Sequence, residues 1–147
     1  MNVGIYIHIP FCKSRCIYCG FYSTTNKELK ERYVDALIRE IHMRKDDFAR
    51  LGTSLSPSST STVYFGGGTP SSLSVCDIER IVGALESTFN GTPSEVTLEM
   101  NPDDVTKDYI KAVRQMGINR ISMGIQTFDD SRLQFIRRRH NASQAEK

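Results

Sequence analysis

The sequence lacks a strong imbalance of charge, and it lacks long apolar runs. Its formal net charge of +2 over 147 residues is too small to indicate a nucleic-acid partner. Because it nowhere has about 18 apolar residues in succession, we expect no transmembrane segment. Its start, Met1–His8, lacks the basic region and apolar core of a signal peptide. Apolar residues make up 39% and charged residues 24%, so we expect an ordinary globular protein in the cytoplasm.

Cysteine is scarce, and three of the four cysteines stand close together as Cys12, Cys16 and Cys19. In a reducing compartment such thiols bind metal rather than pair as disulfides. The spacing C-x3-C-x2-C can hold three irons of a four-iron cluster and leave the fourth iron without a protein ligand. An open metal position indicates chemistry. The remaining Cys76 stands alone at a predicted helix start, where we expect a small buried residue.

Two other interpretations of the cysteine triplet stay open at this point. His8 would complete a Cys3His zinc site, and the chain would then be a zinc-stabilised α/β binding module. Cys16 and Cys19 also have the C-x-x-C spacing of a thioredoxin-like redox pair. That interpretation leaves Cys12 without a role. The spacing alone favours the iron–sulfur cluster without excluding the other two.

Four β-rich runs alternate with helical patterns along the chain. The predicted strands are Val3–Ile9, Thr62–Phe65, Glu95–Met100 and Ile118–Gly124. We expect the polar segment 52–61, between the first helix and the second strand, to be a surface connector. Strands that alternate with helices at this spacing predict right-handed βαβ units and a parallel sheet.

Four helices are predicted after these strands. Thr25–Glu28 reads as a capping box for a long helix, and Ser74–Asp77 as a capping box for the second. The third covers Tyr109–Met116 and is closed by Gly117, and the last covers about Asp129–Ile136. Helical spacing gives the first helix an apolar face, which consists of Leu29, Tyr33, Val34, Leu37, Ile38, Ile41 and Phe48.

Polar or chemically capable residues follow every predicted strand. The cysteines follow the first strand, the glycine run 66–68 the second, Glu99 ends the third, and Gln126 lies just beyond the fourth. Parallel sheets and β/α barrels gather ligands at the carboxyl ends of their strands, so we expect one site there. The glycine run lets the backbone approach a ligand closely. It lacks the lysine and the spacing of a phosphate loop, which disfavours binding of a nucleoside triphosphate.

Four ordered motifs resemble the radical S-adenosylmethionine (SAM) enzymes, and more closely the oxygen-independent coproporphyrinogen III oxidases and their heme-chaperone relatives. The motifs are Cys12–Cys19, Tyr64–Ser71, Leu98–Asp103 and Ser122–Phe128, and the resemblance runs from about Tyr6 to His140. It implies an α/β fold, a partial (β/α) TIM-type barrel with about four β/α units in this chain. We expect residues 1–147 to be the N-terminal part of a radical SAM core domain, without the rest of the barrel and the C-terminal domain.

The resemblance also implies the cofactors and the residues that bind them. Cys12, Cys16 and Cys19 match the ligands of a [4Fe-4S] cluster whose open iron binds SAM. Further matches to family positions around SAM are Tyr6, Tyr18, Gly67, Gly68, Thr69, Glu99, Gln126 and Arg138. We expect Arg137 and Arg139 to form a solvated basic turn, and we expect His42 and His140 to be structural.

Phe21 indicates the branch of the family. The oxidases have a further cysteine at this position, two residues after the third cysteine, whereas phenylalanine is the pattern of the heme chaperones. We therefore expect a heme chaperone of heme and porphyrin metabolism, with heme or porphyrin and an electron-donor protein as partners. The alternative is an oxygen-independent coproporphyrinogen III oxidase, which decarboxylates its substrate to protoporphyrinogen IX. The sequence leaves open whether the protein is an enzyme, and also whether this stretch alone is active.

Overall fold

The computed structural model describes residues 3–46, 60–89 and 92–146. Its centre is a parallel sheet with the strand order β1-β2-β3-β4, so strands that are neighbours in space are consecutive in sequence. Their bounds are β1 Val3–Ile9, β2 Thr60–Gly67, β3 Glu95–Met100 and β4 Arg120–Met123. The predicted alternation of parallel strands and helices is confirmed. No helix among the described residues is both long and apolar enough to span a membrane.

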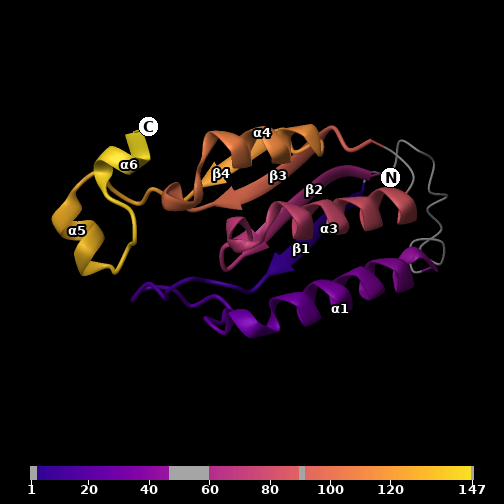
Figure 1. The fold of residues 1–147 in the computed structure, drawn as a ribbon, viewed down its shortest axis with the longest axis horizontal. Helices are drawn as coiled ribbons and strands as arrows, with labels where there is room; N and C mark the ends of the chain where they lie inside the picture. Colours follow the sequence, from indigo (N-terminus) through magenta and orange to yellow (C-terminus); the bar gives the residue numbers. More distant parts are fainter. Residues whose placement is uncertain (1–2, 47–59, 90–91, 147) are drawn as a thin grey trace.

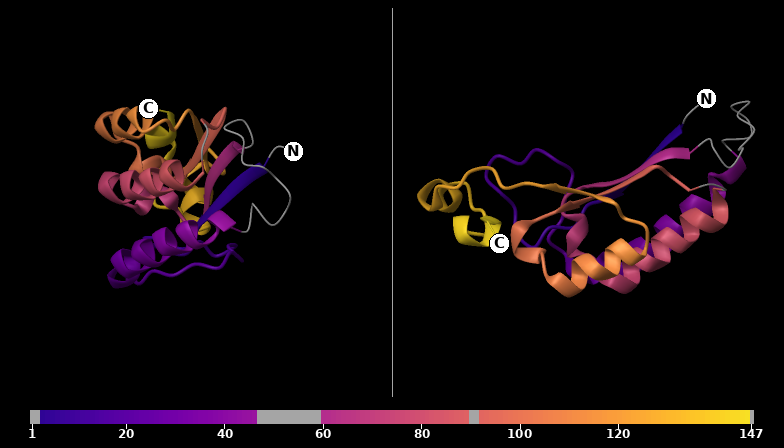
Figure 2. Two further views of the ribbon diagram at one scale, coloured as in Figure 1. Left: turned by 90° about the vertical axis from the view of Figure 1, so that its right-hand side faces the viewer. Right: turned by 90° about the horizontal axis from the view of Figure 1, so that it is seen from above.

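Three long helices cover one face of the sheet, as the two views of Figure 2 show. They are α1 Lys30–Met43, α3 Val75–Thr88 and α4 Lys107–Gln115. Short helices α5 Asp130–Phe135 and α6 Ala142–Glu146 lie beyond the carboxyl ends of the strands (Figure 1). Three single turns of 3-10 helix lie between the strands and the long helices among the described residues. They are η1 Lys27–Leu29, η2 Pro70–Ser72 and η3 Pro102–Asp104.

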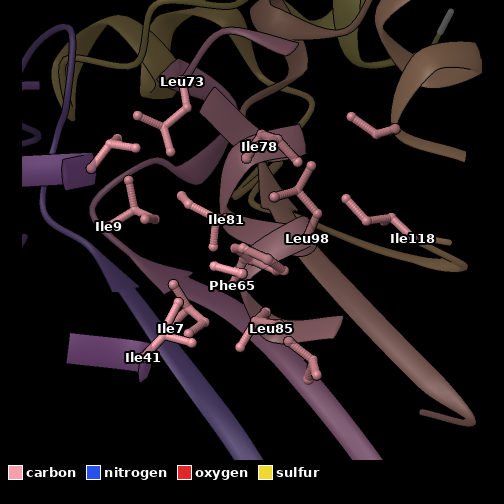
Figure 3. Packing of buried hydrophobic residues seen from close by; sticks show 14 of the residues in the cluster. Ile7, Ile9, Ile41, Phe65, Leu73, Ile78, Ile81, Leu85, Leu98 and Ile118 are labelled. Atoms are coloured by element: carbon pink, nitrogen blue, oxygen red, sulfur yellow. The ribbon is translucent and has the colours of Figure 1, made fainter. Parts of the chain in front are cut away.

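The hydrophobic core lies between the sheet and the three long helices (Figure 3). Side chains alternate between the two faces of a strand, and the apolar set of each strand faces the helices. Ile9, Phe65 and Leu98, from three successive strands, are completely buried. Ile78 and Ile81 of α3 are also completely buried, because their spacing places them on one side of the helix. This packing fixes the strands and leaves their carboxyl ends available to carry a site.

The start of the first helix differs from its prediction. The side chain of Asn26, not Thr25, caps the chain by accepting a hydrogen bond from the Glu28 amide, and the first turn is 3-10 helix. Leu29 falls on this turn and is 42% exposed, so its assignment to the apolar face is wrong. Val34 and Ile41 are buried as expected, and Phe48 lies outside the described residues. The capping box of Ser74 and Asp77 is confirmed by both of its hydrogen bonds.

Strand boundaries also differ, for reasons of pairing. β2 begins at Thr60 and continues through Gly67, because His8 and Ile9 pair with Gly66 and Gly67. The predicted connector 52–61 thus ends in strand, and its residues 52–59 lie outside the described ones. The fourth strand, predicted as Ile118–Gly124, is shorter at both ends in the structure. Helix α6 was not predicted. Cys76 is exposed on α3, so its predicted burial is wrong. It follows the cap by two residues, on the outer side of the first turn.

Candidate metal and cofactor site

A cavity of about 250 Å³ opens at the carboxyl ends of the strands. It is lined by segments that follow all four strands. Every predicted site residue except Tyr6 lines it, namely Cys12, Cys16, Tyr18, Cys19, Gly67, Gly68, Thr69, Glu99, Gln126 and Arg138. The structure therefore brings together residues that span more than a hundred positions of sequence. This convergence is what a parallel sheet produces when each strand ends in a functional loop.

The cysteines lie on a loop that is closed at its base. The Cys12 amide donates to the Thr24 carbonyl at 2.9 Å, and the Thr24 amide donates to the Pro10 carbonyl at 2.7 Å. All three thiols are free and partly buried. Within the described ranges, no three His, Cys, Asp or Glu side chains are already gathered as a metal site. The loop thus presents the thiols to one cavity.

Neighbouring residues donate hydrogen bonds to two of the cysteine sulfurs. The Thr69 hydroxyl lies 3.6 Å from the Sγ of Cys12, and a guanidinium nitrogen of Arg138 lies 3.6 Å from the Sγ of Cys16. The thiolate is the form of cysteine that binds metal. The donor set of three thiols, two of them with hydrogen-bond donors, fits an iron–sulfur cluster.

His8 is not placed as a fourth ligand for these thiols. Its Nδ1 lies 3.2 Å from the Tyr6 hydroxyl and its Nε2 lies 3.1 Å from the Tyr22 carbonyl. Both ring nitrogens therefore have partners already, and His8 is outside the cavity lining. This arrangement disfavours the Cys3His zinc site that the sequence left open.

Gly68 lets the glycine run pass close to the cysteine loop. A Cβ at Gly68 would lie 3.0 Å from the Sγ of Cys12 and 3.1 Å from the Phe11 carbonyl, and real Cβ atoms rarely approach other atoms so closely. Gly67 has a φ of 117°, which favours glycine. A Cβ there would lie 2.7 Å from the His8 ring. The run thus serves tight packing around the thiol as well as approach to a ligand.

Glu99 is held in the cavity wall by two donors. The Tyr64 hydroxyl donates to its Oε1 at 2.7 Å, and the Gly67 amide donates to its Oε2 at 3.2 Å. The hydrogen bond with Glu99 raises the pKa of Tyr64, and burial raises it further by a smaller amount. No lysine pairs with Glu99 among the described contacts. Its carboxylate is therefore a fixed negative group that can bind a cationic ligand.

Arg138 lines the cavity and joins three segments around it. Its guanidinium donates to the Asn101 side chain, the Gly124 carbonyl and the Sγ of Cys16. Its Nε is buried and has no hydrogen-bond partner in the described chain, so this side chain retains donor capacity. Asn101 is a site residue that sequence reasoning missed. Its position directly after the third strand, two residues beyond Glu99, is the signal that would have found it.

An ionic network beside the cavity was also missed. The Asp104 carboxylate, whose side chain is 3% exposed, binds Lys13 of the cysteine loop, the Ser71 hydroxyl at 2.9 Å and Arg139 at 3.4 Å. Arg139 also pairs with Asp103 at 2.6 Å. The prediction of a solvated turn is therefore wrong for Arg139, because two carboxylates far away in sequence cover it.

The remaining predicted residues occupy different places. Tyr18 is 51% exposed and lines the cavity. Tyr6 is 57% exposed on the face of the sheet opposite the helices, with its ring 6.1 Å from that of Tyr64. Gln126 is exposed and has a φ of 70°, a conformation uncommon for a residue with a side chain. His140 is buried and its Nε2 contacts the Ile125 carbonyl at 3.1 Å, as expected of a structural histidine.

Several known proteins resemble this chain. The profile of the radical SAM superfamily matches residues 6–147. The anaerobilin synthase of Escherichia coli O157:H7 is 40% identical over 127 residues, which cover 85% of this chain and 27% of that protein. The heme chaperone HemW of Synechocystis sp. is 35% identical over 148 residues, which cover 95% of this chain and 34% of that protein.

A solved structure is similar as well. Coproporphyrinogen III oxidase (HemN) from Escherichia coli, a radical SAM enzyme, superposes with a TM-score of 0.84 at 30% identity. The match covers 97% of this chain and 32% of that one. The chain thus spans between 27% and 34% of the length of these three relatives.

Proposed function

The chain belongs to the radical SAM superfamily, and we propose that the protein acts in heme or porphyrin metabolism as a heme chaperone. The convergence of the three cysteines with Gly68 and Glu99 in one cavity is the observation that carries the radical SAM part of the proposal. Phe21 supports the chaperone branch, because the related oxidases have a cysteine at that position. Relatives named heme chaperone align over most of this chain, which supports the same branch.

The superfamily as a whole uses a [4Fe-4S] cluster and SAM, and we propose that this chain holds both. Cys12, Cys16 and Cys19 would bind the cluster. Residues proposed to contact SAM are Tyr6, Tyr18, Gly67, Gly68, Thr69, Glu99, Gln126 and Arg138. When bound, the two groups together supply reductive cleavage of the sulfonium bond of SAM, which is the chemistry of the superfamily. The structure supports Tyr6 least, since it lies outside the cavity.

The chain's own residues would orient the cofactor and tune its surroundings. Glu99, fixed by Tyr64 and by a backbone amide, would accept hydrogen bonds from the amino group of SAM. Arg138, whose side chain lines the cavity, would donate to the carboxylate of SAM. Donors on the sulfurs of Cys12 and Cys16 would affect the reduction potential of a cluster bound there.

An oxygen-independent coproporphyrinogen III oxidase is the alternative function, and the likeness to a solved oxidase structure supports it. Heme or porphyrin and an electron-donor protein are the proposed partners in either case. The test is to measure heme binding and coproporphyrinogen decarboxylation on the full-length protein reconstituted with iron, sulfide and SAM. Heme binding without decarboxylation supports the chaperone, whereas decarboxylation would overturn that branch in favour of the oxidase.

We also propose that residues 1–147 form the N-terminal part of a radical SAM core domain. Support comes from the sheet, in which each successive strand adds to the same edge, as in the beginning of a β/α barrel. A cytoplasmic location is proposed as well. The partly buried free thiols of the cysteine loop are of the kind that persists in a reducing compartment.

A further inference from the structure

Two arginines at the mouth of the cavity carry charge that no described carboxylate neutralises. Arg15 and Arg137 both line the cavity and are exposed. The Nε of Arg15 donates a hydrogen bond to the hydroxyl of Ser23 at 3.3 Å. This hydroxyl is neutral, so it leaves the charge of Arg15 unbalanced. The side chain of Arg137 makes no hydrogen bond or ion pair with the described part of the chain.

The other charged groups of the cavity already have partners. Arg139 is paired with Asp103 and Asp104, and Arg138 donates hydrogen bonds to groups of three other segments. Glu99 is the one carboxylate among the described lining residues. SAM has a single carboxylate, for which Arg138 is the proposed partner. Arg15 and Arg137 therefore remain for an additional anionic group.

Exposed aromatic side chains line the same cavity as these arginines. Phe21 is 66% exposed and Tyr18 is 51% exposed, and both line the same cavity. Next to Phe21, Tyr22 is 83% exposed. Exposed apolar groups gathered in one place mark a binding surface rather than ordinary surface composition. Flat apolar faces next to two guanidinium groups match a flat apolar ligand that bears carboxylates.

We propose that Arg15 and Arg137 bind the carboxylates of a tetrapyrrole whose ring packs against Phe21 at the cavity mouth. This inference rests on the proposed function, because it states where on this chain heme or porphyrin is held. The competing occupant is the acidic surface of an electron-donor protein. Both arginines line a cavity and not a flat face, and this favours the tetrapyrrole over a protein surface.

The test uses hemin and hemin dimethyl ester, which share a ring but differ in free carboxylates. Binding of each to the full-length, cluster-loaded protein is measured by absorbance titration. The variants are Arg15→Gln, Arg137→Gln and Phe21→Ser, and Arg132→Gln is the matched control. Arg132 is also exposed and cationic, but it lies on α5 outside the cavity lining. Iron and sulfide content of every variant shows whether the cysteine loop is intact.

Each arginine variant should bind hemin about five- to tenfold more weakly, as expected for loss of a charged hydrogen bond. Its affinity for the ester should equal that of the unaltered protein, and Arg132→Gln should bind both like the unaltered protein. Phe21→Ser should weaken both ligands by about tenfold, because the lost contact is apolar. Lysine at position 15 or 137 should restore part of the affinity for hemin.

Different failures have different meanings. If the unaltered protein binds neither ligand, the proposed heme function fails and this inference fails with it. If it binds hemin but the arginine variants bind equally well, only the inference is overturned. Unchanged hemin binding together with slower reduction by a reduced flavodoxin or ferredoxin would assign the arginines to protein docking, which also overturns the inference.

Discussion

Replacing Asp104 by asparagine should loosen the cysteine loop without unfolding the sheet. The Asp104 carboxylate is buried and binds Lys13 within that loop, while Ser71 and Arg139 hold it from two other segments. It is one of the points at which the loop is tied to the body of the domain. Asparagine keeps the shape of the side chain but removes its charge, so Lys13 loses its ionic partner and Arg139 loses one of its two.

The size of the effect follows from what each cation retains. A hydrogen bond to a charged group contributes about 1.5–3 kcal/mol. Arg139 keeps Asp103 at 2.6 Å, and Lys13, with a side chain 42% exposed, returns to water. We therefore expect a loss near the lower end of this range, about 2 kcal/mol in the free energy of opening the loop. This corresponds to a roughly thirtyfold increase in the equilibrium constant for opening.

Hydrogen exchange followed by mass spectrometry on the full-length protein measures this opening. Peptides that cover residues 10–24, which include the bonded amides of Cys12 and Thr24, should exchange about thirtyfold faster in Asp104→Asn. Peptides from β2 and β3 should be unchanged. Asp108→Asn, the same change at an exposed position of α4, is the matched control. Unchanged exchange in the loop would refute the reasoning, and uniformly faster exchange would show that Asp104 supports the whole fold instead.

Three further predictions concern single side chains. Gly68→Ala should lower the iron and sulfide content, because its Cβ would meet Cys12 and nearby backbone. Gly20→Ala in the same loop meets nothing within 4 Å and should load normally; equal loading of both would contradict the packing account. Glu99→Gln should weaken SAM binding about tenfold in equilibrium dialysis of the reconstituted protein, and unaltered affinity would remove Glu99 from the site. Burial, with a smaller effect of a nearby carboxylate, raises the pKa of Tyr109 to about 12. The contribution of Tyr109 to stability should therefore be constant below pH ~10 and fall as pH rises toward 12, since the unfolded state ionises there before the folded state does. In denaturant titrations Tyr109→Phe should make the fall smaller, and the raised pKa values of Tyr33 and Tyr64 account for part of what remains; an unchanged fall would contradict this cause.

The sequence predicted the strands and the residues at their ends because both depend on local patterns. Alternating apolar residues locate Val3–Ile9 and Glu95–Met100 without knowledge of the fold. Once the sheet is taken as parallel, the cysteines, the glycine run and Glu99 must meet at one edge. The capping box at Ser74 was predictable for the same reason, since its two hydrogen bonds join residues three apart.

What the sequence could not predict depends on contacts between distant segments. Arg139 looks like a solvated residue in sequence, and only the folded chain brings Asp103 and Asp104 against it. Asn101 acquires its role from Arg138, which approaches from beyond the fourth strand. Tyr6 lies on the same face of the sheet as Glu99, but its strand position is level with Thr97, two residues before Glu99, so it lies outside the cavity. Periodicity gives two faces for that strand but does not say how far along a face the cavity extends.

Anaerobic reconstitution of the full-length protein with iron and sulfide tests the central claim most directly. The account predicts close to four irons and four sulfides per protein and the visible absorption of an iron–sulfur cluster. Serine at Cys12, Cys16 or Cys19 should abolish this uptake, whereas Cys76→Ser, at an exposed cysteine outside the cavity lining, should leave it intact. Stoichiometric zinc without sulfide uptake, or normal cluster content in a triplet variant, would contradict the account.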